Sequence, residues 1–412
     1  MALCYFIAAV AAVFINILAA VDALPSAILA SNMQIDDVIR EYFNAGYEYS
    51  NIVSLLLAYH GIRISISTLK RFLRKKKMRR RNVEISDVAI RRAIQTELNG
   101  PGSLLGYRGM WNKLRQDYGV NVARDKVMKI LKEMDPTGTE MRKSNCLKRR
   151  VYRNKGPNYA WHVDGYDKLR PYGFDIHGCI DGYSRRIMWL EVGPTNKNPA
   201  VICGYYLKCV QHIGGCPQIL RTDPGSENTL IAALQCTFRR NSTDQFAGDA
   251  SHRYGKSVFN QRIEAWWSVL KKNYSGWWIE TLKDLVEFGA LDIGNDFHIN
   301  CLRFCLMDII QDELNRFVNC WNNHTIRPSK RAECPHGKPN ILYLLPHENG
   351  THDFKTVVSQ DDIVWANSIC KDNISKTEER SDIFFENVLQ REGKHLPCNW
   401  NEAIELYLFL VG

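Results

Sequence analysis

Three acidic residues stand in three local settings that a single fold could bring together. Asp164 ends an apolar run, Asp223 follows a second apolar run at a Pro-Gly turn, and Glu264 lies within a helical pattern. Carboxylate oxygens are the ligands that hard divalent cations such as Mg²⁺ prefer, and such cations keep positions open for phosphate oxygens. We therefore predict that these three side chains are metal ligands and the catalytic groups of a phosphate chemistry.

The elements that would position these acids begin at residue 159, where the hydrophobic pattern takes the period of strands. Four strands are predicted, at 159–166, 173–183, 185–193 and 217–222. Helical patterns follow at 198–213, 227–238 and 260–274. This order predicts an α/β fold, a mixed sheet flanked by helices. Asp164 would lie on the first strand, Asp223 at the end of the fourth, and Glu264 on a helix packed against the sheet.

The N-terminal part of the chain is strongly basic. Residues 26–155 contain 27 Lys and Arg and 12 Asp and Glu, a net charge of +15, whereas the remainder of the chain carries −5. Such an asymmetry indicates that the first part holds a polyanion. It makes DNA the expected partner.

The charge is densest between Lys70 and Arg81, where nine of twelve residues are Lys or Arg. Ser67 is the predicted N-cap of a helix here, and Leu69 and Leu73 would point inward. Two helices precede it within residues 33–82, so the order is that of a helix-turn-helix. The residues predicted to bind DNA phosphates are Lys70, Arg71, Arg74 and Lys75. A nuclear-import signal or a flexible tail is the alternative for this run.

A second helical unit is predicted over residues 83–141, again with exposed Lys and Arg, and a basic linker over 142–157. Together the two units indicate an all-α, bipartite DNA-binding region ahead of the sheet. The alternative is a helical dimerisation module, since periodicity does not separate the two. A homo-oligomer is expected.

The stretch from 158 to 345 resembles the catalytic core of retroviral integrases and DDE transposases, which has a ribonuclease H-like fold. The resemblance rests on Asp, 58 intervening residues, Asp, 40 intervening residues and Glu, with D-x-G-x-E-N at the second acid. With GYRGMWNKLRQDYG upstream, the chain looks most like the cellular integrase-core-domain proteins of animals.

This resemblance implies a site with two Mg²⁺ or Mn²⁺ ions, held by Asp164, Asp223 and Glu264, that cleaves phosphodiesters and transfers strands. It also implies DNA contacts from Asn260 and Lys271 and no small-molecule substrate. Three departures qualify it. Ser268 stands where relatives usually present a Lys, the zinc-binding HHCC domain is missing, and a long loop precedes Glu264, expected to be mobile. A catalytically silent protein that binds DNA or chromatin is therefore the second function considered.

The first 25 residues form an uncharged hydrophobic leader up to Val21, typical of a signal peptide or a marginal membrane span. It lacks a basic n-region, so the other reading is an upstream extension with Met33 as the working start. A nuclear protein without a membrane segment is expected. A secreted or membrane-anchored protein is the alternative if the leader is genuine.

Thirteen cysteines without paired CxxC spacing indicate buried, reduced thiols and no zinc site. Asp181 is predicted to serve a structural turn, and Trp266, Trp267, Trp277 and Trp278 to pack in the core. Residues 346–412 are predicted as a polar tail with one short terminal helix.

Overall fold

The computed structural model describes residues 34–80, 85–136, 139, 154–255, 260–328, 334–371 and 377–412. The hydrophobic leader, Met33 and residues 142–153 of the basic linker lie outside this part of the chain. Across the described ranges, no helix has both the length and the apolar character that crossing a bilayer requires.

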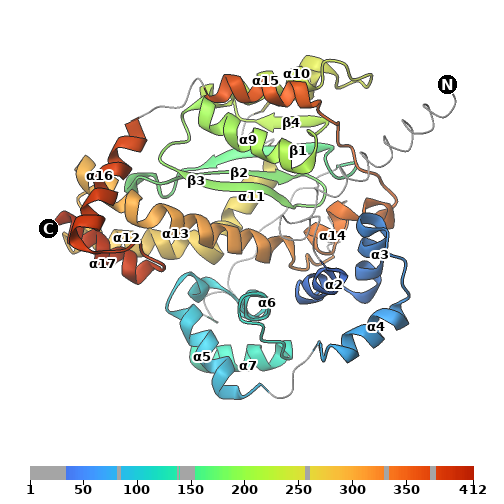
Figure 1. Cartoon of the computed structure of the whole chain (residues 1–412), viewed down its shortest axis with the longest axis horizontal. Coiled ribbons are helices and arrows are strands. Elements are labelled where there is room, and N and C mark those ends of the chain that lie inside the picture. Colours follow the sequence, from blue (N-terminus) through green and yellow to red (C-terminus); the bar gives the residue numbers. More distant parts are fainter. Residues whose placement is uncertain are drawn as a thin grey trace.

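One five-stranded sheet organises the second half of the chain (Figure 1). Its strands are β1 (Ala160–Tyr166), β2 (Asp175–Asp181), β3 (Ile187–Gly193), β4 (Ile219–Thr222) and β5 (His252–Tyr254). The order across the sheet is β3-β2-β1-β4-β5. The first three strands are antiparallel, whereas β4 runs parallel to β1 and β5 parallel to β4. The predicted mixed sheet is confirmed.

The fifth strand lies within the segment that was expected to be a long loop before Glu264, so part of that segment has regular structure. Gly248–Ser251 forms a 3-10 turn, and His252 in β5 pairs with Leu220 in β4. Near the start of the segment, the guanidinium of Arg239 forms an ion pair with the carboxylate of Asp244 at 2.5 Å. A strand of three residues is too short to show an alternating hydrophobic pattern in the sequence. Its pairing with the backbone of β4 forms only in the folded chain. Residues 256–259 lie outside the described part.

Helices cover both faces of the sheet, as predicted. One face carries α9 (Pro199–Ile213), α10 (Thr229–Phe238) and α15 (Gln360–Lys371). The other face carries α11 (Gln261–Leu270) and α13 (Asp296–Asn322), with α12 (Gly276–Glu287) packed behind them. The predicted helix at 260–274 is longer than expected, because a π-helical segment, Lys271–Ser275, leads from α11 directly into α12.

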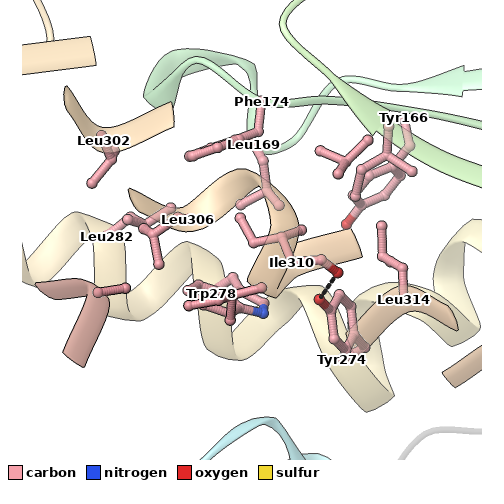
Figure 2. Packing of buried hydrophobic residues seen from close by; sticks show 14 of the residues in the cluster. Tyr166, Leu169, Phe174, Tyr274, Trp278, Leu282, Leu302, Leu306, Ile310 and Leu314 are labelled. Atoms are coloured by element: carbon pink, nitrogen blue, oxygen red, sulfur yellow. Dashed lines mark hydrogen bonds between the residues drawn. The ribbon is translucent and has the colours of Figure 1, made fainter. Parts of the chain in front are cut away.

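Figure 2 shows how this second layer is packed. Tyr274 of the π-helical segment donates its hydroxyl to the carbonyl of Ile310 on α13, at 3.1 Å. Trp278 is fully buried against the same helix. Burial of aromatic and leucine side chains on this scale is the main force that fixes α11 and α12 against α13.

The basic N-terminal unit consists of α2 (Ile35–Asn44), α3 (Tyr49–His60) and α4 (Ile66–Lys75). Ser65, and not Ser67, caps α4, since its Oγ accepts the N–H of Thr68 at 3.1 Å. Ser65 has the extended backbone that an N-cap needs, whereas Ser67 already lies in the first turn. The unit shares its core with a later segment of the chain. Its buried cluster also includes Leu344 of α14 (Pro339–Leu344) and Leu345, the residue that follows this helix.

The second helical unit is formed by α5 (Asp87–Leu98), the 3-10 turn η1 (Pro101–Leu104), α6 (Tyr107–Asp117) and α7 (Arg124–Met134). Its buried cluster draws only on residues between 85 and 134, so this unit has its own core.

The tail prediction was right only for the terminal helix, α17 (Trp400–Val411). The η7 turn (Pro346–Asn349), α15 and α16 (Thr377–Glu392) were missed. Ile363 and Ala366 of α15 are buried on α9, and Leu406 of α17 joins the α13 cluster. Contacts with a distant surface stabilise these helices, and a weak local pattern does not reveal such contacts. A disulfide also joins Cys203 on α9 to Cys370 on α15, so the prediction of reduced thiols is wrong for this pair.

Candidate active site

The sheet sets Asp164 and Asp223 at the same level. His162 of β1 is paired with Arg221 of the parallel strand β4, and each acid lies two residues further along its chain. Neighbouring strands lie about 4.8 Å apart. Equal offsets along two parallel strands therefore bring the two carboxylates to adjacent positions at one edge of the core.

Asn260 fixes the start of α11 beside Asp164. Its side-chain amide donates to the carbonyl of Val163, and its Oδ1 meets His162 Nδ1, both at 2.8 Å. Both partners belong to β1 and directly precede Asp164. Because Glu264 follows Asn260 by one helical turn, this tether places the third acid over the same strand.

A second contact comes from the same helix. The indole N–H of Trp267 donates to Oδ2 of Asp164 at 2.8 Å. Gly178, the residue opposite Asp164 on β2, provides the space for that indole. A Cβ at Gly178 would lie 2.8 Å from the Trp267 ring. Helix α11 is thus joined to β1 at two points, one on each side of Glu264.

The charges of the three acids act on one another. Burial first, and then the charges of Glu264 and Asp223, raise the pKa of Asp164 to about 7, against the hydrogen bond from Trp267. Burial and then the charge of Asp223 raise the pKa of Glu264. Like charges held together in this way favour protonation or a bound cation.

The donor chemistry suits a hard divalent cation, although the side chains are not assembled around one. Oδ1 of Asp223 is buried and has no hydrogen-bond partner in the described part of the chain. Across those same residues, however, no three His, Cys, Asp or Glu side chains are close enough to hold a metal ion as they stand. The oxygens would have to converge through side-chain rotation.

A fourth acid, Glu227, was missed as a site residue. After burial, its charge is the cause that raises the pKa of Asp223. Its Oε1 accepts from Asn228 Nδ2 at 3.1 Å, and the same amide reaches the carbonyl of Asp223 at 3.1 Å. The carboxylate folds over Gly225, where a Cβ would lie only 1.8 Å from it. The D-x-G-x-E-N pattern contains this acid, so the signal was in the sequence.

The residues predicted to contact DNA differ in their exposure to solvent. Lys70, Arg71, Arg74 and Lys75 are all exposed on α4, at the periphery of the molecule (Figure 1). Lys271 is exposed at the end of α11. Asn260 is only 2% exposed, and its side-chain amide is hydrogen-bonded to residues of β1. In this structure its side chain positions α11 on β1, and its contact with DNA stays a prediction.

Other predictions for single residues held. Asp181 is fully buried and accepts hydrogen bonds from the backbone of Asn158, Tyr183 and Ser184, as a structural turn requires. Trp266, Trp267 and Trp278 are buried, and Trp277 packs at the edge of the same cluster.

Residues 151–339 match the sequence profile of the family described as the integrase core domain. The sheet order β3-β2-β1-β4-β5, with three antiparallel and two parallel strands, is the ribonuclease H-like arrangement that this family implies. No curated protein matches the chain.

Proposed function

Because residues 151–339 are an integrase core domain, we propose that this protein binds DNA and cleaves and joins phosphodiester bonds at Asp164, Asp223 and Glu264. The observation that carries the proposal is the double attachment of α11 to β1. Asn260 and Trp267 hold the helix so that the charge of Glu264 acts on Asp164, and the pairing of β4 with β1 adds the charge of Asp223.

The cofactor proposed is Mg²⁺ or Mn²⁺, as two ions held by Asp164, Asp223 and Glu264. Divalent ions in such a site activate the attacking oxygen and stabilise the leaving oxygen. Neighbouring residues of the chain hold these carboxylates in place through hydrogen bonds. Trp267 orients Asp164 by engaging Oδ2, and Asn228 holds the backbone of Asp223 in its turn.

DNA binding is proposed to use the exposed cations of α4, together with Lys271, which is exposed at the end of α11. The three N-terminal helices would act as a helix-turn-helix, and α4 would approach the duplex. A positively charged helix of this kind gives affinity through phosphate contacts that weaken as salt rises.

The test is cleavage and strand transfer on labelled duplex ends with Mg²⁺ or Mn²⁺, comparing the native protein with Asp223→Asn. Asp312→Asn, at an exposed position of α13, is the matched charge control. Products from the native protein and the control, with none from Asp223→Asn, are expected. Equal products from all three proteins would remove the carboxylates from the mechanism.

A catalytically silent DNA-binding protein is the second candidate, and one observation favours it. In the described part of the chain the carboxylates do not converge into a metal group. No products from any variant, together with DNA binding that depends on α4, would select this function.

A nuclear, homo-oligomeric protein is proposed as the setting for this chemistry. Location of tagged full-length protein in cells tests the first part, and a secretory or membrane location would contradict it. Light scattering of the purified chain tests the second part, and a monomer at all concentrations would contradict that.

A further inference from the structure

A cavity of about 1280 Å³ lies between the second helical unit and the core domain. One wall is formed by the end of α5, η1 and α6, and the other by Val269, Tyr274 and the C-terminal half of α13. The volume exceeds the roughly 300–1,000 Å³ of ordinary small-molecule sites. None of the three catalytic candidates lines it. The cavity is therefore separate from the site proposed above.

The lining is predominantly cationic. Seven Lys and Arg side chains face four carboxylates, an excess of three positive charges. Three of the carboxylates are already engaged: Lys113 pairs with Glu97 and Asp117, at 3.6 and 3.2 Å, and Arg316 lies 3.9 Å from Glu313. The remaining cations are Arg108, Arg115, Arg124, Arg327 and Lys338.

Arg115 combines burial with an incomplete set of hydrogen bonds. Its Nε donates to the carbonyl of Asn44 at 3.1 Å, but its Nη2 is buried without a hydrogen-bond partner among the described residues. The guanidinium lies directly on Gly46, which has no side chain to exclude it. A planar guanidinium with an unpaired N–H, on a residue that lines the cavity, is able to pair with a phosphate oxygen.

Lys338 adds a second charge at the same place. Its Nζ donates to the carbonyl of Ala45 at 2.8 Å. Burial, and then the charge of the neighbouring Arg80, lower the pKa of Arg115 to about 10. Burial, then Arg115 and Arg80, lower the pKa of Lys338, and the carboxylate of Glu48 acts against them. Cations that repel one another in a partly desolvated place are stabilised when an anion joins them.

Aromatic side chains complete the lining. Trp111, Trp321, Trp400 and Tyr118 face the cavity, and the Arg115 guanidinium lies 5.2 Å from the centre of the Trp111 ring. Concave cationic surfaces that also present aromatic faces are typical of sites for single-stranded nucleic acid, where bases stack and phosphates meet cations.

We propose that this cavity binds a single-stranded segment of nucleic acid, with a backbone phosphate on Arg115 and Lys338 and bases against the tryptophans. The proposal deepens the proposed function by naming a second DNA site, and it rests on that function for the identity of the polymer. A frayed or displaced strand would be held here while its duplex portion is held elsewhere.

The experiment measures binding of a fluorescent single-stranded oligonucleotide to the full chain in EDTA over a range of salt concentrations. EDTA keeps divalent ions from the carboxylates, so the result does not depend on whether the protein cleaves DNA. The variants are Arg115→Gln and Arg108→Gln. Arg92→Gln, an exposed position on α5 that does not line the cavity, is the matched control.

Arg115→Gln should weaken binding about tenfold, as expected for a hydrogen bond to a charged group. It should also flatten the dependence of log K on log salt by about 0.7. Arg92→Gln should change neither quantity. Arg108→Gln, which removes an exposed cavity cation, should weaken binding in the same direction, so the proposal remains testable if Arg115→Gln does not fold.

Two results would overturn the proposal. In the first, Arg108→Gln and the Arg92→Gln control bind the strand with the same affinity and salt dependence. In the second, inorganic phosphate raises the melting temperature of the native protein but not of Arg115→Gln, while strand binding is unaffected. The cavity would then be a site for a free anion. If the native protein binds the single strand but does not cleave duplex ends, that result would count against the carboxylate site alone.

Discussion

Trp267 donates its indole N–H to Oδ2 of Asp164 across 2.8 Å, and so a core residue of α11 touches a catalytic candidate on β1. The bond favours the charged carboxylate, because an N–H donor stabilises the ionised form. Asp164 nevertheless has a pKa of about 7, since burial and two neighbouring acids outweigh it. The packing of α11 thereby controls the protonation of the proposed metal ligand.

Trp267→Phe keeps the ring and removes the donor. The pKa of Asp164 should rise further, by about one unit, since a hydrogen bond to a charged group is worth about 1.5–3 kcal/mol. Metal binding needs the deprotonated form, so the midpoint of Mn²⁺ binding against pH should move upward. Calorimetric titration of Mn²⁺ at several pH values measures this. An unchanged midpoint would separate Trp267 from the site.

Asp164→Asn should stabilise the metal-free protein above neutral pH. The folded pKa of about 7 lies above the ordinary value of 3.8, so the native state binds more protons than the unfolded chain between these values. Stability of the native protein therefore falls as pH rises from about 4 to about 7, by a few kcal/mol at most. Asp181, with a raised pKa of about 6, adds a similar trend in both proteins. The difference between their urea midpoints isolates Asp164, and it should grow over this range.

Asn260→Ala should destabilise the fold by about 2–4 kcal/mol, because it removes two buried hydrogen bonds, one to the carbonyl of Val163 and one to the ring of His162. Urea unfolding measures the change. Ser268→Ala, at an exposed position of the same helix, is the control and should stay within about 0.5 kcal/mol. Equal effects of the two substitutions would contradict the tether between α11 and β1.

Gly178→Ala should cost about 1–3 kcal/mol, since the new methyl group would lie 2.8 Å from the Trp267 ring and 3.1 Å from Leu190. The shifted indole should also lose its bond to Asp164 and reduce any metal-dependent cleavage. Gly204→Ala on α9 meets nothing within 4 Å and should be neutral or stabilising by up to about 1 kcal/mol. Thermal melting of both variants tests the contrast.

The elements that carry the site were predictable, because each has a strong local signal. The alternation around Val163 and the apolar run before Asp223 identify strands β1 and β4. The spacing of the three acids carries the resemblance to integrase cores, and the profile match over residues 151–339 agrees with it. The helical units at the N-terminus were equally readable from their amphipathic period.

Other features depend on partners far away in the sequence. Asn260 was expected to face DNA, yet it binds the backbone of a strand almost a hundred residues earlier. The pairing of β5, the docking of α15 and the Cys203–Cys370 bond are long-range contacts of the same kind. Local patterns do not record such contacts.

The sequence alone determined the acids, their order along the chain and the separation of a basic half from an acidic half. Only the tertiary structure decided that α11 is held on β1 by Asn260 and Trp267, and that Arg115 meets Lys338 at the wall of a cavity. The reason is physical. Residue type and spacing set what each group is able to do, whereas burial and neighbouring charges, which exist only in the folded chain, set its pKa and its partners.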